Sequence, residues 1–279
     1  TGNTNVAIGN YAGGAITEGT QNIAIGYAAL DAANGVGSGA EAYNVAIGHN
    51  AMTAETSGAQ HCTAVGYQAL LAQNGGAAQV TNTAIGGNAG AELVGGTANT
   101  LIGYNAGNQL DSTEGYNTFV GHDAGSNADG GETNTFIGAV AGGLGVVEGN
   151  GNVAIGYAAG YDLTDGPGNV LIGNAAGANM TIGDENVAVG KDAATAMVGD
   201  SNYNIAIGSA ALFSEASGAD DCIAIGKNAL VLQNDAAAVN LAIGKQAGDA
   251  ITSGTKNVLI GHQAGSTLAA TGTNTGDEC

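Results

Sequence analysis

Several residue types are absent or scarce in this 279-residue chain, which has no Trp, no Arg, one Pro, three Phe and three Cys. A collagen triple helix is excluded, because Pro is nearly absent and the 51 Gly do not recur at every third residue. Three Cys do not make a disulfide framework in a chain of this length. Disorder is not expected either, because 44% of the residues are apolar and they recur periodically.

Basic residues are scarce as well, with 24 acids against four Lys and a formal net charge of −20. Phosphate binding requires clustered Lys and Arg, so the composition argues against nucleic acid or an anionic membrane as a partner. The acids are scattered among predicted loops, which favours a solvated surface over a metal site. No apolar run approaches the roughly 20 residues of a transmembrane helix, so we expect no membrane insertion.

One phrase is repeated along the chain, first as Asn5–Gly13 (NVAIGNYAG) and then fourteen more times. The Gly at its fifth position recurs every 17 or 18 residues, apart from gaps of 22 residues after Gly26 and 20 after Gly66. Such periodicity identifies a repeat architecture. The repeat array spans residues 1–265, and residues 266–279 are predicted to form a Thr/Gly-rich tail or junction.

Each position of the phrase keeps its residue type. The first is Asn in thirteen copies and Cys62 or Cys222 in the others, the fourth is Ile or Val, the fifth Gly and the eighth Ala. Positions two to four are rich in Val, Ile and Thr, which indicates a short strand between Asn and Gly. A coil of 17 or 18 residues is too short for a strand plus a normal helix. We therefore predict an all-β parallel β-solenoid, or β-roll, of about fifteen coils.

Four positions receive structural roles: Asn forms a ladder between coils, Ile or Val fills the interior, Gly makes a bend, and Ala permits tight packing. Both strand faces are apolar, so one face can line the coil while the other needs a cover that an isolated coil does not supply. The predicted structural residues include Asn5, Ile8, Gly9, Ala12, Asn22, Ile25, Gly26, Ala29, Asn152, Ile155, Gly156 and Ala159.

A longer periodicity lies above the first, because the block 43–107 is duplicated as 203–265, nine repeats later. Cys62 and Cys222 occupy the same place in the two blocks. The ninth position, usually Gly, is bulky in several copies, and we expect those residues to widen the coil or pack a longer loop. They are Leu30, Met52, Leu70, Leu212 and Leu230.

The pattern N-x-A-I-G-x-x-A resembles the head repeats of trimeric autotransporter adhesins of the YadA type. It resembles equally the repeat arrays of phage tail-fibre proteins that precede endosialidase-type chaperone domains. The resemblance covers residues 1 to about 265 and implies a left-handed β-roll that forms a homotrimer. Such a trimer would bury either the third-position column or its opposite between chains. The adhesin repeat is shorter, so this chain carries extra loop residues in each coil.

His49, His122 and His262 each follow the fifth-position Gly, in a column that also contains Tyr27 and Tyr67. These His lie many coils apart, so a metal site within one chain is not expected. We predict a rim position that accepts amphipathic rings.

Cys62 and Cys222 lie nine coils apart, roughly 43 Å at the spacing of β-strands, which excludes a bridge between them within a straight rod. Cys in place of the ladder Asn favours a small buried residue over an interchain bond, although the interchain bond stays open. Cys279, at the end of the sequence, is the better candidate for an interchain bond.

A column of five Thr occupies the second position of consecutive copies: Thr63, Thr83, Thr100, Thr118 and Thr135. A regular Thr array on a flat solenoid face can match the lattice of ice, so an ice-binding solenoid is an alternative. The Thr column shares a face with the Ile or Val of the fourth position, which favours an interior location.

No G-x-S-x-G elbow, H-E-x-x-H motif or phosphate-binding loop is present in the sequence, so we expect neither an enzyme nor a cofactor. We predict a structural fibre segment with adhesive or receptor-binding loops, first of all in a phage fibre. A bacterial surface adhesin and an extracellular filament that stacks end to end are the alternatives. The predicted location is a virion fibre, the cell surface or the extracellular space. The receptor or glycan is unspecified, and the two longest loops, Asp31–Ala42 and Leu71–Val80, are its expected contacts.

Overall fold

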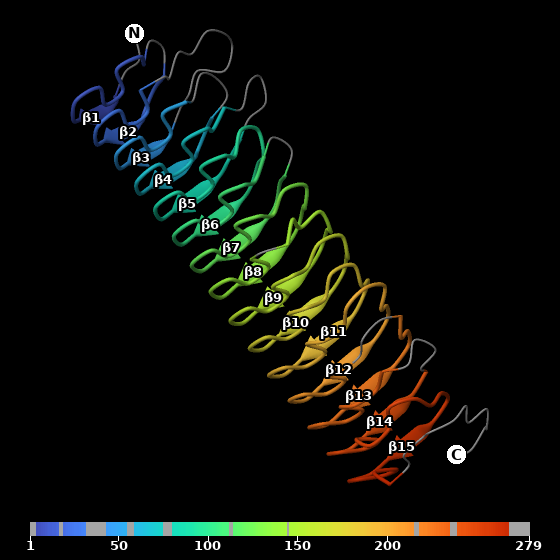
Figure 1. Ribbon diagram of the computed structural model, residues 1–279. Helices are drawn as coiled ribbons and strands as arrows, with labels where there is room; N and C mark the ends of the chain where they lie inside the picture. Colours follow the sequence, from blue (N-terminus) through green and yellow to red (C-terminus); the bar gives the residue numbers. More distant parts are fainter. Residues whose placement is uncertain are drawn as a thin grey trace. The chain divides into compact units, whose positions relative to one another are not determined.

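The computed structural model of the chain describes residues 4–16, 19–31, 43–54, 59–74, 80–111, 114–143, 145–214, 218–234 and 239–267. Within these residues the regular structure consists of three-residue strands, and no helix is present (Figure 1). Each strand comprises positions two to four of one copy of the phrase. The strands are β1 (Val6–Ile8), β2 (Ile23–Ile25), β3 (Val45–Ile47), β4 (Thr63–Val65), β5 (Thr83–Ile85), β6 (Thr100–Ile102), β7 (Thr118–Val120), β8 (Thr135–Ile137), β9 (Val153–Ile155), β10 (Val170–Ile172), β11 (Val187–Val189), β12 (Ile205–Ile207), β13 (Ile223–Ile225), β14 (Leu241–Ile243) and β15 (Val258–Ile260).

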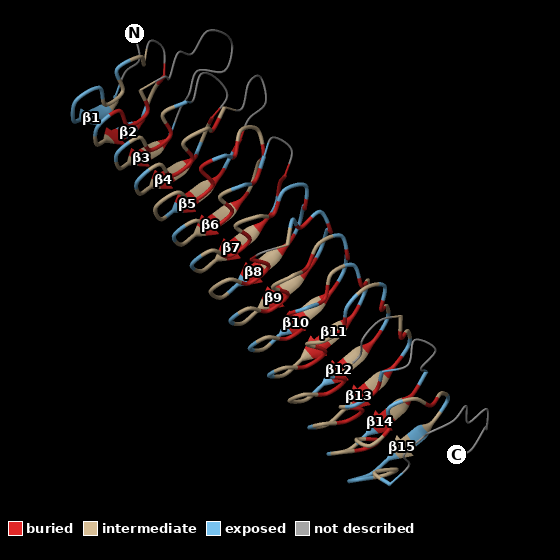
Figure 2. Cartoon of the chain, viewed as in Figure 1, coloured by how far each residue is buried: buried red, intermediate tan, exposed pale blue. Residues whose placement is uncertain are grey.

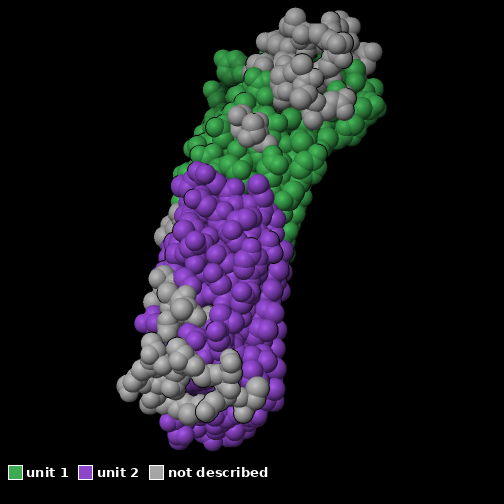
Figure 3. Space-filling model, turned by 90° about the vertical axis from the view of Figure 1, so that its right-hand side faces the viewer, with its two compact units in different colours: residues 1–139 green, residues 140–279 purple. Residues whose placement is uncertain are grey.

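The chain divides into two compact units, residues 1–139 with β1–β8 and residues 140–279 with β9–β15 (Figure 3). Within each unit every strand pairs in parallel with the next strand along the chain. Equivalent positions stand opposite one another, so that Thr118 pairs with Thr135 and Phe119 with Phe136. The predicted all-β parallel β-solenoid, with one coil per repeat, is confirmed in both units.

The third and eighth positions line the interior of each coil. From β2 to β14 their side chains are at most 1% exposed, whereas the first and last strands are more open (Figure 2). Phe119 and Phe136 stack in the third-position column with ring centroids 4.9 Å apart. Ala29 and Ala159 are fully buried, as the predicted tight packing requires, while Ala12 in the first coil is half-buried.

The second and fourth positions face away from the interior. Successive side chains of a strand point to opposite faces, so a buried third position places its two neighbours outside. Ile8 is 59% exposed, and Ile25 and Ile155 are half-buried on the same outer side. The interior role predicted for these three Ile residues is wrong, because other positions already fill the coil.

The ninth position supplies much of that filling. Where the third position is Leu or Phe, the ninth is Gly, because a Cβ on Gly125 would lie 2.5 Å from the ring of Phe119. Where the third position is Ala, five coils carry a bulky ninth residue that is fully buried. These residues therefore pack inside the coil. They are Leu30, Met52, Leu70, Leu212 and Leu230.

In other coils both positions are small, and a neighbouring coil fills the space. A Cβ placed on Gly90 would lie 2.7 Å from Leu101 Cδ1 and 3.0 Å from Leu70 Cδ2. Leu side chains from the coils on either side therefore occupy the volume that Ala84 and Gly90 leave open. A large side chain at one position thus fills the space that a small residue leaves at another position of the same coil or in a neighbouring coil.

The fifth-position Gly turns the chain at the end of every strand, with φ between +130° and +146°. A Cβ on Gly208 would lie 2.6 Å from the carbonyl carbon of Gly226 in the next coil. Backbone angle and close approach both exclude larger residues here, so Gly9, Gly26 and Gly156 occupy the bend that the sequence predicts.

Candidate interaction face

We use the name outward face for the sheet surface formed by the second- and fourth-position side chains of each unit. These side chains are Val, Ile, Leu or Thr throughout, and from β2 to β14 each is half-buried or exposed. Ile207 is 39% exposed and Ile172 is 36% exposed. In-register pairing stacks equivalent residues into straight columns about 4.8 Å apart per coil. The outward face of each unit is therefore a regular apolar surface.

Two further columns border this face. The leading margin is the residue just before the first-position Asn, and the trailing margin is the sixth position, just after the Gly. Each margin lies just beyond one end of the strand, two residues along the chain from an outward-facing side chain, and most of its residues are exposed. Both margins are rich in exposed Tyr, His and charged residues. Most described leading-margin residues also have positive φ, for example 61° at Tyr43 and 62° at Lys256.

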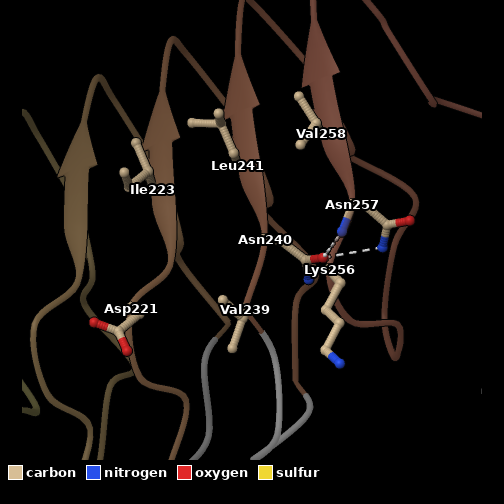
Figure 4. Close-up of a pocket in the computed structure, with 8 residues that line it drawn as sticks. All are labelled: Asp221, Ile223, Val239, Asn240, Leu241, Lys256, Asn257 and Val258. Carbon is tan, nitrogen blue, oxygen red and sulfur yellow. Dashed lines mark hydrogen bonds between the residues drawn. The ribbon is translucent and has the colours of Figure 1, made fainter. Parts of the chain in front are cut away.

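A hollow of about 260 Å³ lies on the outward face over β13, β14 and β15 (Figure 4). Figure 4 shows Val239 between Asp221 and Lys256, three successive leading-margin residues beside the apolar second-position column. The leading margin therefore shares the surface of the outward face. The lining residues are Asp221, Ile223, Val239, Asn240, Leu241, Lys256, Asn257 and Val258.

Aromatic and imidazole rings stack along both margins of the first unit. On the trailing margin the rings of Tyr27 and His49 lie 4.9 Å apart, and His49 also contacts the ring of Tyr67 at 5.6 Å. On the leading margin Tyr43 and His61 stack at 4.9 Å. Tyr67 is 53% exposed, so the predicted rim position for amphipathic rings is confirmed.

His122 extends the same pattern, with its ring 5.4 Å from that of Tyr104 and its Nδ1 atom 2.8 Å from the Asp123 carboxylate. His262 is exposed in the last coil. In the part of the chain that the structure describes, no three His, Cys, Asp or Glu side chains gather closely enough to hold a metal ion.

All four Lys of the chain border the outward face of the second unit. Lys191, Lys227 and Lys245 stand on its trailing margin, and Lys256 stands on its leading margin. Lys191 lies 3.5 Å from the Asp192 carboxylate, whereas Lys227 and Lys245 form no ion pair with the described residues. The basic charge of an acidic chain is thus confined to the edges of one surface.

Two acids, Glu185 and Asp221, stand on the leading margin of the second unit, and Asp184 precedes Glu185. Burial, together with repulsion from Asp200 and Glu185, raises the pKa of Asp184. The leading margin of this unit thus carries two acids and Lys256, whereas its trailing margin carries the other three Lys.

Asn side chains join many successive coils within each unit behind this face. The Asn22 N–H donates to Oδ1 of Asn5 at 2.8 Å, and the Asn169 N–H donates to Oδ1 of Asn152 at the same distance. Asn5 Nδ2 also donates to the Gly19 carbonyl at 2.8 Å. The Asn residues thus form a ladder with a hydrogen bond from coil to coil, which holds the strands of the outward face in register.

Cys62 takes part in this ladder in place of Asn. Its N–H donates to Asn44 Oδ1, its Sγ donates to the Val80 carbonyl at 3.2 Å, and its Sγ accepts from the Asn82 N–H at 3.3 Å. Cys222 likewise donates its N–H to Asn204 Oδ1 at 2.9 Å. Both Cys are fully buried, as small interior residues would be.

An interchain disulfide requires a sulfur that another chain can reach. Because Cys62 and Cys222 have no exposed surface, the interchain role left open for them is wrong for the folded chain. Cys279 lies outside the described residues. The same holds for most of the loop Asp31–Ala42, for residues 75–79 of the loop Leu71–Val80, and for the tail beyond residue 267.

The Thr column occupies the outward face. Thr63, Thr83, Thr100, Thr118 and Thr135 are all half-buried at the outward-facing second position. The interior location expected for them is wrong for the same reason as for the fourth-position Ile, since both share the face opposite to the third position.

Comparisons with known proteins add no relative: no protein-family model, curated protein or solved structure is significantly similar to this chain. Among the described residues, no helix has the length and hydrophobicity needed to cross a membrane.

Proposed function

We propose that the chain is a structural fibre segment, in which three copies pack through their outward faces and leave the loops free to contact a receptor. The observation that carries this proposal is the regular apolar outward face on an otherwise acidic, Gly-rich coil. A soluble monomer rarely exposes a continuous apolar patch of more than a few hundred Å². Packing between copies removes this surface from water.

The face is long enough for such packing, because the seven coils of the second unit span about 34 Å along the stack. The homotrimer and its left-handed coils come from the resemblance to adhesin and tail-fibre repeats. A phage fibre is the first setting that we propose, and a bacterial surface adhesin would use the same assembly.

Sedimentation equilibrium of the purified chain tests this function. We expect a species of three times the 26.7 kDa chain mass. Ile207→Glu places a charge on the outward face. It should lower the association constant of the trimer by at least about tenfold, because burying an unpaired carboxylate between copies costs free energy. Leu232→Glu is the matched control, since Leu232 is 46% exposed and follows strand β13, outside the second and fourth positions that form this face. A native chain that sediments only as monomer would refute the proposal.

The outward Thr column favours one other function, ice binding, through an ordered array of hydroxyl and methyl groups. Four in-register pairs connect the five Thr from β4 to β8, and each pair places one Thr directly opposite the next. This function requires the face to be open to solvent, so it competes with packing between copies. A monomeric chain that reshapes growing ice crystals, and loses that effect in Thr118→Lys, would favour ice binding.

A further inference from the structure

We propose that the two margins of the outward face pair with each other across neighbouring copies of the chain, coil by coil. This pairing would align the copies parallel and in register, and it rests on the proposed packing through the outward face. The apolar columns alone do not specify an alignment, because every coil presents similar Val, Ile and Thr side chains. The margins differ from coil to coil and can therefore specify it.

The geometry of a strand determines which margins meet. Each strand crosses the face, so the leading- and trailing-margin residues of one coil stand at the same level on opposite sides. Around a rotation axis parallel to the stack of coils, the leading margin of one copy faces the trailing margin of the next. Antiparallel copies would instead bring margins of the same kind together. Parallel in-register copies therefore oppose the two margin residues of the same coil.

The charges of the second unit match under this rule. The coil of β11 carries Glu185 on its leading margin and Lys191 on its trailing margin, and the coil of β13 carries Asp221 and Lys227 in the same places. Both acids of the leading margin thus meet a Lys of the neighbouring copy. Asp221 and Lys227 form no ion pair with the described residues of their own chain, so both are available to a neighbour.

A slip of one coil weakens this match. In one direction Asp221 stands opposite Ser209, and Lys256 is brought opposite Lys245. In the other direction Glu185 stands opposite Ser209, while Asp221 meets Lys245, so only one of the two charge pairs remains. Like charges at an interface are unfavourable and suppress the first slip, and the aligned register alone gives both acids a Lys.

The rings of the first unit match in the same way. The coil of β3 has Tyr43 and His49 on its two margins, and the coil of β4 has His61 and Tyr67. Over these two coils each margin carries one Tyr and one His, in opposite order, so aligned copies place a Tyr beside a His at both levels. A slip of one coil places Tyr43 beside a Tyr instead. The coil of β7 repeats the pattern with Tyr116 and His122.

Charge reversal at one coil tests the pairing. Asp221→Lys and Lys227→Asp, each alone, should lower the association constant of the trimer by at least about tenfold, because like charges then meet at three symmetric contacts. The double variant should restore the constant to within about threefold of the native value. Lys256 occupies the same column with φ of 62°, close to the 60° of Asp221, so a Lys fits this backbone.

The control variant combines Asp221→Lys with Lys245→Asp, which places the compensating acid one coil away, and it should remain weakened. Circular dichroism of each variant at low concentration checks that the coils are folded. A native chain that is monomeric refutes the proposed function itself. A native trimer whose single reversals are neutral, or which Lys245→Asp rescues as well as Lys227→Asp does, overturns the register pairing and leaves the fibre function standing.

Discussion

Single residues in left-handed backbone conformations set the path of each coil. Besides the fifth-position Gly, the seventh position has φ between 50° and 60° in all fifteen copies, and it is never Gly. Asn, Asp and Gln occupy many of these positions, and Asn and Asp tolerate this conformation better than other residues do. The frequent Asn and Asp at this position are consistent with a left-handed conformation. The same column also contains Tyr11 and Ala28, so the conformation could not be predicted from residue type alone.

Val140 is the least suitable residue in that column. Its φ is 52°, and a β-branched side chain in the left-handed region is strained. We expect Val140→Asn to raise the free energy of unfolding by about 1 kcal/mol and Tm by about 2–4 °C. Differential scanning calorimetry at fixed protein concentration measures both quantities.

Asn228 provides the reciprocal control, because it has φ of 58° at the same position of another coil. Asn228→Val should lower the stability by a similar amount. If both substitutions shift Tm in the same direction, backbone strain is not the property that governs this position.

Within a coil, the third and ninth positions share one interior space, so a large residue at one of them accompanies a small residue at the other. Ala64 accompanies Leu70, whereas Phe119 accompanies Gly125, and all three apolar side chains are fully buried. The sum of the two volumes therefore matters more than the size of either residue. This explains how a chain with three Phe and no Trp builds a continuous interior.

Phe119→Ala should destabilise the first unit by about 3–5 kcal/mol, because it leaves a cavity beside Phe136. Adding Gly125→Leu should recover at least about 2 kcal/mol, since it recreates the arrangement of Ala64 and Leu70. The Leu is compatible with the backbone, because Leu70 has φ of 49° where Gly125 has 55°. Chemical denaturation of the two single variants and the double variant gives the coupling energy.

The single variant Gly125→Leu completes the double-mutant cycle with Phe119→Ala and the double variant. With Phe119 present, the new side chain meets the ring within 2.5 Å of its Cβ, so the single variant should be strongly destabilised. Additive effects of the two substitutions would show that the positions do not share one space.

The sequence predicted the strand, the bend and the ladder because each depends on local chemistry. Asn, Gly and the Val/Ile-rich run act through their own backbone or through the equivalent residue of the next coil. Which strand face lies inside depends instead on what fills the coil from elsewhere. Ile207 and Ala206 are both apolar, and only the position of the eighth- and ninth-column residues decides that Ala206 is the buried one.

The candidate site was predicted less completely than the fold. The Tyr and His of the trailing margin were recognised as rim residues, because a mixed ring column suits a half-exposed edge. The leading margin was missed, since Tyr43 and Asp221 belong to no repeated residue type. It could have been recognised by comparing the two margin residues of the same coil. In several coils an acid on the leading margin accompanies a Lys on the trailing margin, or a Tyr accompanies a His.

The whole chain carries its apolar surface where assembly would bury it, so its stability should depend on its concentration. Folding then coincides with removal of the outward face from water, and only the assembled state gains that contribution. We expect Tm of the native chain to rise over about a hundredfold increase in concentration, equivalent to roughly 2.7 kcal/mol when subunits reach about 100 times Kd.

Ile207→Glu separates this linkage from the intrinsic stability of the coils. Ile207 contributes no interior packing, since it points outward and is 39% exposed, so the isolated coil should retain its ladder and its core. The variant should therefore unfold at one Tm across the same concentrations, near the value that the native chain approaches on dilution. If the native chain also has a constant Tm, the outward face is not buried by self-association. The open Thr and Ile columns would then have to be explained by a ligand in solution or by ice.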